Sequence, residues 1–229
     1  MENTLHELEQ NRDKSHLFED RSHAGRVLAK MLAPYYGQSA EALVLAIPSG
    51  GVPIGVVLSR ELELRFDLII VRKLQIPGNT EAGFGALSLE GRVFLNEELL
   101  SRLQLERRQI QDQIAIVRKE LEARNAMFRQ GRPLPDVDGK TVILADDGLA
   151  SGYTMIAAAA TVREHGAQKV VVAVPTAPLS TIRKVAPMVN EIYSAHVQSY
   201  GPFAVASAYI RWRDLDREEV LSQIREAGA

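Results

Sequence analysis

The chain has 229 residues, and its 27 lysines and arginines and 29 aspartates and glutamates give a formal net charge of −2. This balance, without a long basic run, gives no reason to expect a nucleic-acid or membrane surface. The sequence has no cysteine, which excludes disulfides, thiolate metal sites and cysteine nucleophiles.

Residues 1–15 are polar and charged, and they predict a frayed surface arm or a short surface helix, without an apolar signal segment. No stretch approaches the roughly 20 apolar residues of a membrane span, so we expect a cytoplasmic protein without membrane contact. Asp20 then precedes "RSHAGRVLAKMLAPYYG", in which apolar residues recur at helical spacing. A helix capped by Asp20 is therefore predicted after the arm.

Two apolar runs follow, and each predicts a buried strand. Residues 42–47, "ALVLAI", form a short continuous apolar run that ends in "PSGG". The stretch "VPIGVVLSRELE" after it predicts a helix with Pro53 in its first turn. Residues 66–74, "FDLIIVRKL", predict the second buried strand.

The middle of the chain is predicted to contain a loop, a hairpin and a helical insertion. Residues 75–88, "QIPGNTEAGFGALS", are rich in glycine and polar residues and predict a mobile loop. A small hairpin is expected to turn at Glu90 and Gly91. Residues 97–130 predict one long amphipathic helix or two, since apolar side chains recur every three, four or seven positions. A helix that covers the core is the plain interpretation, and a dimer seam is the alternative.

Strand and helix patterns alternate again towards the end of the sequence. Residues 141–145 and 169–175 predict strands, with a helix between them that ends at Gly166. Another helix and a weak strand, "EIYSA", follow. Residues 196–229 are expected to form a hood and a C-terminal helix.

This alternation predicts an α/β fold with a mostly parallel central sheet flanked by helices, in one domain over residues 1–229. Ligands of such sheets lie beyond the carboxyl ends of the strands. The segments that leave the predicted strands there are "PSGG", "RKLQIPGNTEAG", "DDGLASGYT" and "PTAP".

The segment "DDGLASGYT" places two acids before a loop of small residues and a helix. Backbone N–H groups at the helix start, with the hydroxyls of Ser151 and Thr154, are suited to binding a phosphate. Asp146 and Asp147 would repel that phosphate, so we expect them to bind the 2′- and 3′-hydroxyls of a ribose 5-phosphate. Their charge would also favour cationic character at the anomeric carbon. The plain alternative is a turn whose acids only cap backbone N–H groups.

The fourteen residues "VILADDGLASGYTM" resemble the signature with which type I phosphoribosyltransferases bind 5-phosphoribosyl 1-pyrophosphate (PRPP). Neither a Walker loop nor a Rossmann fingerprint fits this segment. The resemblance implies that Asp146 and Asp147 hold the ribose hydroxyls. It also implies that the 5-phosphate lies in a loop of Gly148, Ala150, Ser151, Gly152, Tyr153 and Thr154.

The resemblance covers most of residues 17–220 and is to a poorly characterised bacterial branch of the superfamily. It implies that Ser49, Gly50 and Gly51 form the loop that faces pyrophosphate. That branch usually has arginine at the position of Ser49. Tyr153 stands where a small residue is usual.

Three further expectations follow from the resemblance. Arg72 and Lys73 take the place of a basic phosphate contact. The predicted mobile loop takes the place of a catalytic loop that excludes water, and its acid, Glu81, is a candidate to protonate or orient a leaving base. Tyr209 and Trp212 lie where the family forms a hood over the acceptor, although a core or surface role is an equal alternative.

The activity implied by the resemblance is Mg²⁺-dependent transfer of a 5-phosphoribosyl group from PRPP to a purine- or pyrimidine-like nitrogenous acceptor, with release of pyrophosphate. Mg²⁺ would be held mainly by substrate and water, and Asp146 is the candidate protein ligand for the ion. The competing hypothesis is a non-catalytic regulatory protein that binds PRPP or a nucleotide on the same fold. The expected partners are PRPP or a nucleotide monophosphate, with no nucleic acid and no membrane, and a second copy in a homodimer.

Overall fold

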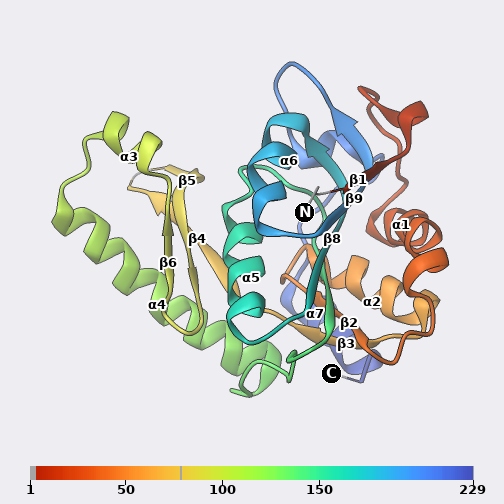
Figure 1. The fold of residues 1–229 in the computed structure, drawn as a ribbon. Coiled ribbons are helices and arrows are strands. Elements are labelled where there is room, and N and C mark those ends of the chain that lie inside the picture. Colours follow the sequence, from red (N-terminus) through yellow and green to blue (C-terminus); the bar gives the residue numbers. More distant parts are fainter. Residues whose placement is uncertain (1–3, 78, 229) are drawn as a thin grey trace.

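The computed structural model describes residues 4–77 and 79–228, with the backbone alone for residues 79–82 (Figure 1). The described residues form a six-stranded main sheet in the order β1-β9-β8-β7-β2-β3, in which every neighbouring pair is parallel. Helices cover both of its faces, so the α/β prediction is confirmed. The strands are β1 (Thr4–Glu7), β2 (Ala42–Ala46), β3 (Arg65–Leu68), β7 (Thr141–Ala145), β8 (Lys169–Pro178) and β9 (Glu191–Gln198).

The strands of the main sheet are apolar along both faces because helices cover both. Successive side chains of a strand point to opposite sides, so β7 places Ile143 in one core cluster and Leu144 in the other. The cluster with Ile143 lies under α1 and α2, and the cluster with Leu144 lies under α5 and α6. These helices are α1 (Arg21–Tyr36), α2 (Gly51–Leu62), α5 (Tyr153–Glu164) and α6 (Leu179–Val185).

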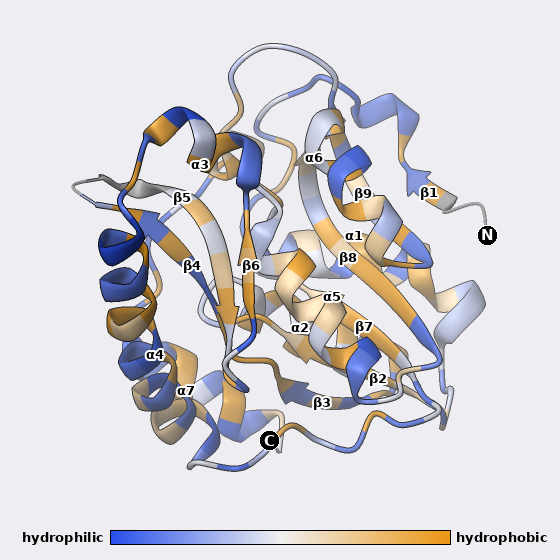
Figure 2. Cartoon of the chain, turned by 60° about the vertical axis from the view of Figure 1, so that its left-hand side comes forward, coloured by the Kyte–Doolittle hydropathy of each residue, from blue (hydrophilic) through white to orange (hydrophobic). Residues whose placement is uncertain are grey.

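A smaller antiparallel sheet, β4-β5-β6, lies between α5 and the long helix α4. Ala86 joins the core under α5, whereas Leu87 packs in a separate cluster with Val117 and Leu121 of α4. Figure 2 shows α4 alternating between apolar and polar residues, as an amphipathic cover helix does. The elements of this layer are β4 (Val71–Ile76), β5 (Asn79–Ser88), β6 (Val93–Leu95), α3 (Glu97–Leu103) and α4 (Arg107–Arg129).

Several local predictions are confirmed. The Asp20 carboxylate accepts from the His23 N–H at 2.9 Å and caps α1. Gly91 has φ +88° at the turn of the predicted hairpin, and the helical insertion is two helices, α3 and α4. No helix in the described part of the chain is long and apolar enough to cross a membrane. The remaining elements are η1 (Glu9–Asn11), η2 (Ala186–Met188), η3 (Val205–Ala208) and α7 (Arg217–Glu226).

The prediction of one buried strand over residues 66–74 is wrong. The strand of the main sheet ends at Leu68, and Val71 begins β4 of the smaller sheet. Ile69 and Ile70 between the two strands are buried, so the apolar run continues while the chain changes sheets. An apolar run indicates that a segment is buried, but it does not show which sheet the segment belongs to or which strand it pairs with.

The predicted loop over residues 75–88 is also wrong in its secondary structure. β4 continues to Ile76, and β5 extends from Asn79 to Ser88. A Cβ atom added to Gly85 would lie 2.2 Å from the Phe94 carbonyl oxygen. Glycine here permits the close approach of a neighbouring strand and does not mark a loop.

The N-terminal segment is not an arm over the residues that the structure describes from Thr4 onward. β1 pairs in parallel with β9 at the edge of the main sheet. The His6 ring stacks on the Tyr193 ring, with centroids 4.2 Å apart. An edge strand has one neighbour and can remain polar, so its sequence lacks the apolar signal of an inner strand.

Candidate functional site

Asp146 and Asp147 follow directly after β7, at the carboxyl end of a strand inside the main sheet. Both residues are mostly buried. They line a hollow of about 380 Å³ together with the loop that joins β7 to α5. The two acids and the predicted phosphate loop therefore border one space.

The loop over residues 148–152 is held in place by α6. Thr181 Oγ1 donates to the Ala150 carbonyl at 2.7 Å, and Lys184 Nζ donates to the Ser151 carbonyl at 3.2 Å. Gly152 precedes the first turn of α5, where backbone N–H groups have no partner within the helix. The loop thus presents the positive end of a helix at the edge of the hollow.

Tyr153 does not fill this hollow. Its neighbours Gly152 and Thr154 line the space, whereas Tyr153 packs against the core cluster under α5. The Tyr153 ring centre lies 4.9 Å from Lys184 Nζ. The aromatic side chain therefore leaves the space beside the loop open for an anion.

The loop after β2 packs directly against the acid pair. A Cβ atom added to Gly50 would lie 2.2 Å from Asp147 Oδ2, so only glycine permits this approach. The adjoining Ser49 hydroxyl accepts from Arg124 Nη2 at 3.2 Å. The peptide bond between Pro48 and Ser49 is cis.

A second hollow of about 330 Å³ adjoins the first, because Lys73, Asp146 and Thr154 line both. Arg72 and Arg124 also line this second hollow. Its walls therefore come from the main sheet, the smaller sheet and α4.

Arg21 is a site residue that the sequence motifs did not indicate. Its Nε atom lies 2.8 Å from Asp147 Oδ2, and the two side chains are 9% and 15% exposed. The guanidinium also stacks 3.9 Å from the centre of the Trp212 ring. The Tyr209 hydroxyl donates to the Asp147 carbonyl at 2.7 Å. Tyr209 and Trp212 therefore support Asp147 and Arg21 from the segment between β9 and α7.

The electrostatic environment disfavours two full charges on the acid pair. Burial raises the pKa of Asp146 well above its usual value, and repulsion from Asp147 raises it further. Burial also raises the pKa of Asp147, against the opposing effect of Arg21. Neutral donors such as sugar hydroxyls would relieve this cost by hydrogen bonding to the carboxylates.

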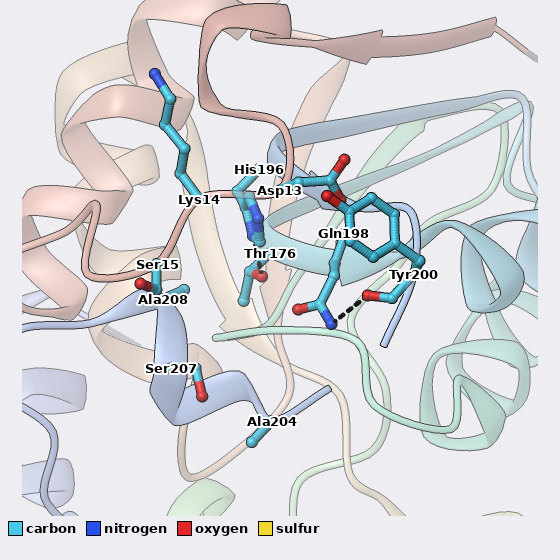
Figure 3. A pocket seen from close by; sticks show the side chains of 10 residues that line it. All are labelled: Asp13, Lys14, Ser15, Thr176, His196, Gln198, Tyr200, Ala204, Ser207 and Ala208. Carbon is cyan, nitrogen blue, oxygen red and sulfur yellow. Dashed lines mark hydrogen bonds between the residues drawn. The ribbon is translucent and has the colours of Figure 1, made fainter. Parts of the chain in front are cut away.

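A third hollow of about 190 Å³ lies beside the ends of β8 and β9 (Figure 3). His196, 3% exposed, lies at its wall with Nδ1 2.8 Å from Thr176 Oγ1. Its buried Nε2 has no hydrogen-bond partner among the described residues, and burial lowers the pKa of His196. The imidazole is therefore neutral at neutral pH.

The comparison with protein families agrees with this geometry. Residues 19–201 match the family model of the phosphoribosyl transferase domain. The chain belongs to this family, within the type I phosphoribosyltransferase superfamily. The matched region includes the main-sheet strands β2, β3, β7, β8 and β9 and both loops that meet at Asp147.

Individual relatives support the same membership. A Mycobacterium tuberculosis protein provisionally named a phosphoribosyl transferase is 34% identical over 214 residues, which are 92% of this chain and 47% of that protein. The chain thus spans about half the length of the curated relatives it matches. The crystal structure of TT1426 from Thermus thermophilus has a TM-score of 0.74 at 32% identity, over 91% of this chain and 98% of that one. A hypothetical protein from Neisseria gonorrhoeae with bound ppGpp shares the fold at 15% identity and a TM-score of 0.50, over 99% and 98% of the two chains.

Most residues predicted for the site of this phosphoribosyltransferase domain meet at the two adjoining hollows. The exceptions are Ser49, Gly50 and Gly51, which lie against the acid pair and Arg124, and Tyr153, which points away. The Glu81 side chain lies outside the described residues. The predicted residues that line the hollows are Arg72, Lys73, Asp146, Asp147, Gly148, Ala150, Ser151, Gly152 and Thr154.

Proposed function

We propose that this protein transfers a 5-phosphoribosyl group from PRPP to a nitrogenous acceptor and releases pyrophosphate. The observation that carries the proposal is the hollow in which Asp146 and Asp147 stand beside the first turn of α5. Membership of the phosphoribosyl transferase family supports the same class of reaction.

The ribose would bind through its 2′- and 3′-hydroxyls to the two carboxylates. Arg21 already orients the Asp147 side chain, so this side chain would lose little conformational entropy when the sugar binds. Asp146 Oδ1 accepts from the Asp147 N–H at 2.8 Å, which fixes its plane. Each sugar hydroxyl then meets a carboxylate acceptor, and the charge of Asp146 is the less compensated of the two.

The 5-phosphate would lie at the helix start. Backbone N–H groups in the first turn of α5 and the hydroxyls of Ser151 and Thr154 are donors beside this part of the hollow. In ribose 5-phosphate the phosphate is on C5 and the diol is on C2 and C3. One molecule could therefore bind to the N–H groups at the start of α5 and to the two carboxylates at the same time.

In the reaction, the bond between C1 of the ribose and pyrophosphate breaks, and the leaving oxygen keeps the electron pair. Positive charge develops at C1, and the carboxylate pair beneath the sugar would stabilise it. A nitrogen lone pair of the acceptor then forms the new bond to C1. The acceptor loses its proton to a base or to solvent.

Magnesium fits this donor set as an ion carried mainly by the substrate. The described residues contain no group of three or more histidine, aspartate or glutamate side chains that could hold a metal. Mg²⁺ keeps several waters and binds phosphate oxygens readily, so Asp146 with substrate and water would suffice. When bound, the ion would neutralise charge on the pyrophosphate leaving group.

The first prediction concerns binding of the sugar phosphate. Asp146→Asn with Asp147→Asn removes both charged acceptors and is expected to weaken ribose 5-phosphate binding at least about tenfold. Titration calorimetry with ribose 5-phosphate, and with PRPP and Mg²⁺, measures this change. Asp112→Asn on α4, where the side chain is 69% exposed, is the matched control and should bind like the parent. A parent that binds neither ligand at millimolar concentration contradicts the proposal, as does a double variant with parental affinity.

The regulatory alternative predicts the same binding without turnover. Release of pyrophosphate from PRPP, measured with a panel of purine and pyrimidine bases, separates the two hypotheses. Tight binding of PRPP with no release for any base would favour the regulatory protein.

A further inference from the structure

We infer that Arg124, in the helical insertion, supplies a guanidinium that binds the pyrophosphate of the substrate. The inference rests on the proposed function, and it makes α4 part of the substrate site as well as a cover for the core. The sequence of α4 predicts only an amphipathic helix, so this role follows from the tertiary structure.

The hollow next to Asp146 has an excess of positive charge. Three cationic side chains, Arg72, Lys73 and Arg124, line it, against the single carboxylate of Asp146. Arg72 is ion-paired with Glu120 of α4, which compensates part of this charge. A ligand with several negative charges would complement this mainly cationic lining, and Arg124 in particular.

Arg124 is positioned at the loop after β2 by a bond across the site. Its Nη2 atom donates to Ser49 Oγ at 3.2 Å. The guanidinium carbon lies 5.2 Å from the centre of the Phe128 ring, one helical turn further along. In the described part of the chain, no carboxylate lies within ion-pair distance of Arg124. Burial lowers the pKa of Arg124, and the nearby charge of Arg72 lowers it further, against the opposing charge of Glu120.

The contact between Arg124 and Ser49 explains how the site can lack a basic residue in the loop. The loop residues Pro48, Ser49 and Gly50 carry no charge, and the short side chain of Ser49 leaves the space beside it to another group. Arg124 reaches this space from α4, 75 residues away in the sequence. The positive charge is therefore present at the loop although it comes from another element.

The position of the hollow identifies the ligand group. It adjoins the proposed ribose site, since Lys73, Asp146 and Thr154 line both spaces. In PRPP the 5-phosphate and the pyrophosphate leave the ribose in different directions. With the 5-phosphate at α5, the second hollow is the place for the pyrophosphate. A planar guanidinium can donate two parallel bonds to phosphate oxygens, which lysine cannot do.

The test measures two ligands separately on the full chain. Titration calorimetry with inorganic pyrophosphate and Mg²⁺ reports the second hollow, and titration with ribose 5-phosphate reports the first. Arg124→Gln is expected to weaken pyrophosphate binding at least about tenfold while ribose 5-phosphate affinity changes less than about twofold. Arg124→Lys should recover only part of the loss. Arg108→Gln, on the same helix and with a side chain 88% exposed, is the matched control and should bind both ligands like the parent.

A charge swap provides the second test. Ser49→Arg added to Arg124→Gln places a guanidinium on the loop next to the vacated position and should restore most of the pyrophosphate affinity. If Arg124→Gln does not fold, Arg124→Lys with and without Ser49→Arg makes the same comparison. Unchanged pyrophosphate binding in Arg124→Gln overturns the inference and leaves the proposed function standing. A parent that binds neither pyrophosphate nor ribose 5-phosphate defeats the proposed function itself.

Discussion

Three atoms of Asp147 have hydrogen-bond partners, two of which come from distant parts of the chain. Arg21 binds the carboxylate, Tyr209 binds the carbonyl, and the backbone N–H donates to Asp146. Gly50 leaves the space that the carboxylate occupies. The side chain is therefore held before any ligand arrives, which is the arrangement that a site needs for orientation. Among the residues that the structure describes, Asp146 has no ion-pair partner like Arg21, and its charge is the more costly of the two.

Asp146→Asn is predicted to stabilise the fold at neutral pH. The raised pKa means that the folded state favours the protonated form, so stability falls as pH rises through the folded pKa. Asparagine removes this cost and can still accept from the Asp147 N–H. We expect a gain on the order of 1 kcal/mol, or a Tm increase of about 2–4 °C at pH 7.5. The gain should shrink as pH falls towards about 4, the ordinary pKa of an unfolded aspartate, because below that pKa Asp146 is protonated in both states.

The comparison variant is Asp147→Asn, which leaves Arg21 buried without its anionic partner. Its Tm is expected to fall at pH 7.5, since an unpaired buried charge is costly. Thermal unfolding followed by circular dichroism measures both variants. Equal Tm changes for the two substitutions would contradict this division of roles.

Among the elements, α4 packs on the smaller sheet and carries Arg124. Its last residue, Arg129, is 2% exposed and binds both carboxylate oxygens of Asp67 on β3, at 3.0 and 3.1 Å. The same guanidinium donates to the carbonyls of Arg132 and Pro133. The end of α4 is thus tied to the edge strand of the main sheet, while Arg124 lies just over one turn earlier.

Arg129→Met is predicted to destabilise the protein by about 3–5 kcal/mol, because Asp67 keeps a buried charge without a partner. Urea denaturation followed by fluorescence or circular dichroism measures the change. The double variant Arg129→Met with Asp67→Leu removes both charges and should recover a large part of the loss. A double variant as unstable as the single one would show that the lost bonds to the backbone carbonyls, and not the unpaired charge, dominate.

In the molecule as a whole, the parallel order of the main sheet brings the strand ends together at one edge. The loops after β2 and β7 meet there at Asp147, and the hollow at His196 lies beside the ends of the neighbouring strands β8 and β9. The smaller sheet adds Arg72 and Lys73 from the side. One edge therefore collects the polar groups, while the two core clusters lie within the sheet's covered faces.

The stability of the whole molecule is predicted to fall in mild acid through His196. Burial lowers the pKa of His196 and the charge of Asp13 opposes this, so the unfolded state binds the proton first as pH falls below about 6.5. The resulting loss of stability should approach about 1 kcal/mol at pH 5.5. The variant His196→Gln has no titrating group at this position. It should therefore lack the pH-dependent loss of stability, independently of how the substitution changes stability at neutral pH.

Denaturation at pH 7.5 and pH 5.5 tests this dependence. The difference in unfolding free energy between the parent and His196→Gln should shift in favour of the variant at pH 5.5. The same difference at both pH values would mean that His196 is protonated in the folded state as readily as in the unfolded one.

The sequence by itself determined the elements whose signals are local. The apolar runs of β2 and β7, the Asp20 cap, the hairpin turn at Gly91 and the helical character of the insertion all follow from residues near one another, whereas the sequence leaves its division into two helices open. The acid pair and the loop after it are also contiguous, so their common hollow could be predicted from fourteen residues. Backbone hydrogen bonding and hydrophobic periodicity act over a few residues, and a sequence pattern records them directly.

Only the tertiary structure decided which distant residues complete the site. Arg21 reaches Asp147 across 126 positions, and Arg124 reaches Ser49 across 75. The split between β3 and β4 and the pairing of β1 with β9 likewise depend on which strand lies alongside. Such contacts are set by the packing of whole layers, and the residues that make them carry no periodicity or motif of their own.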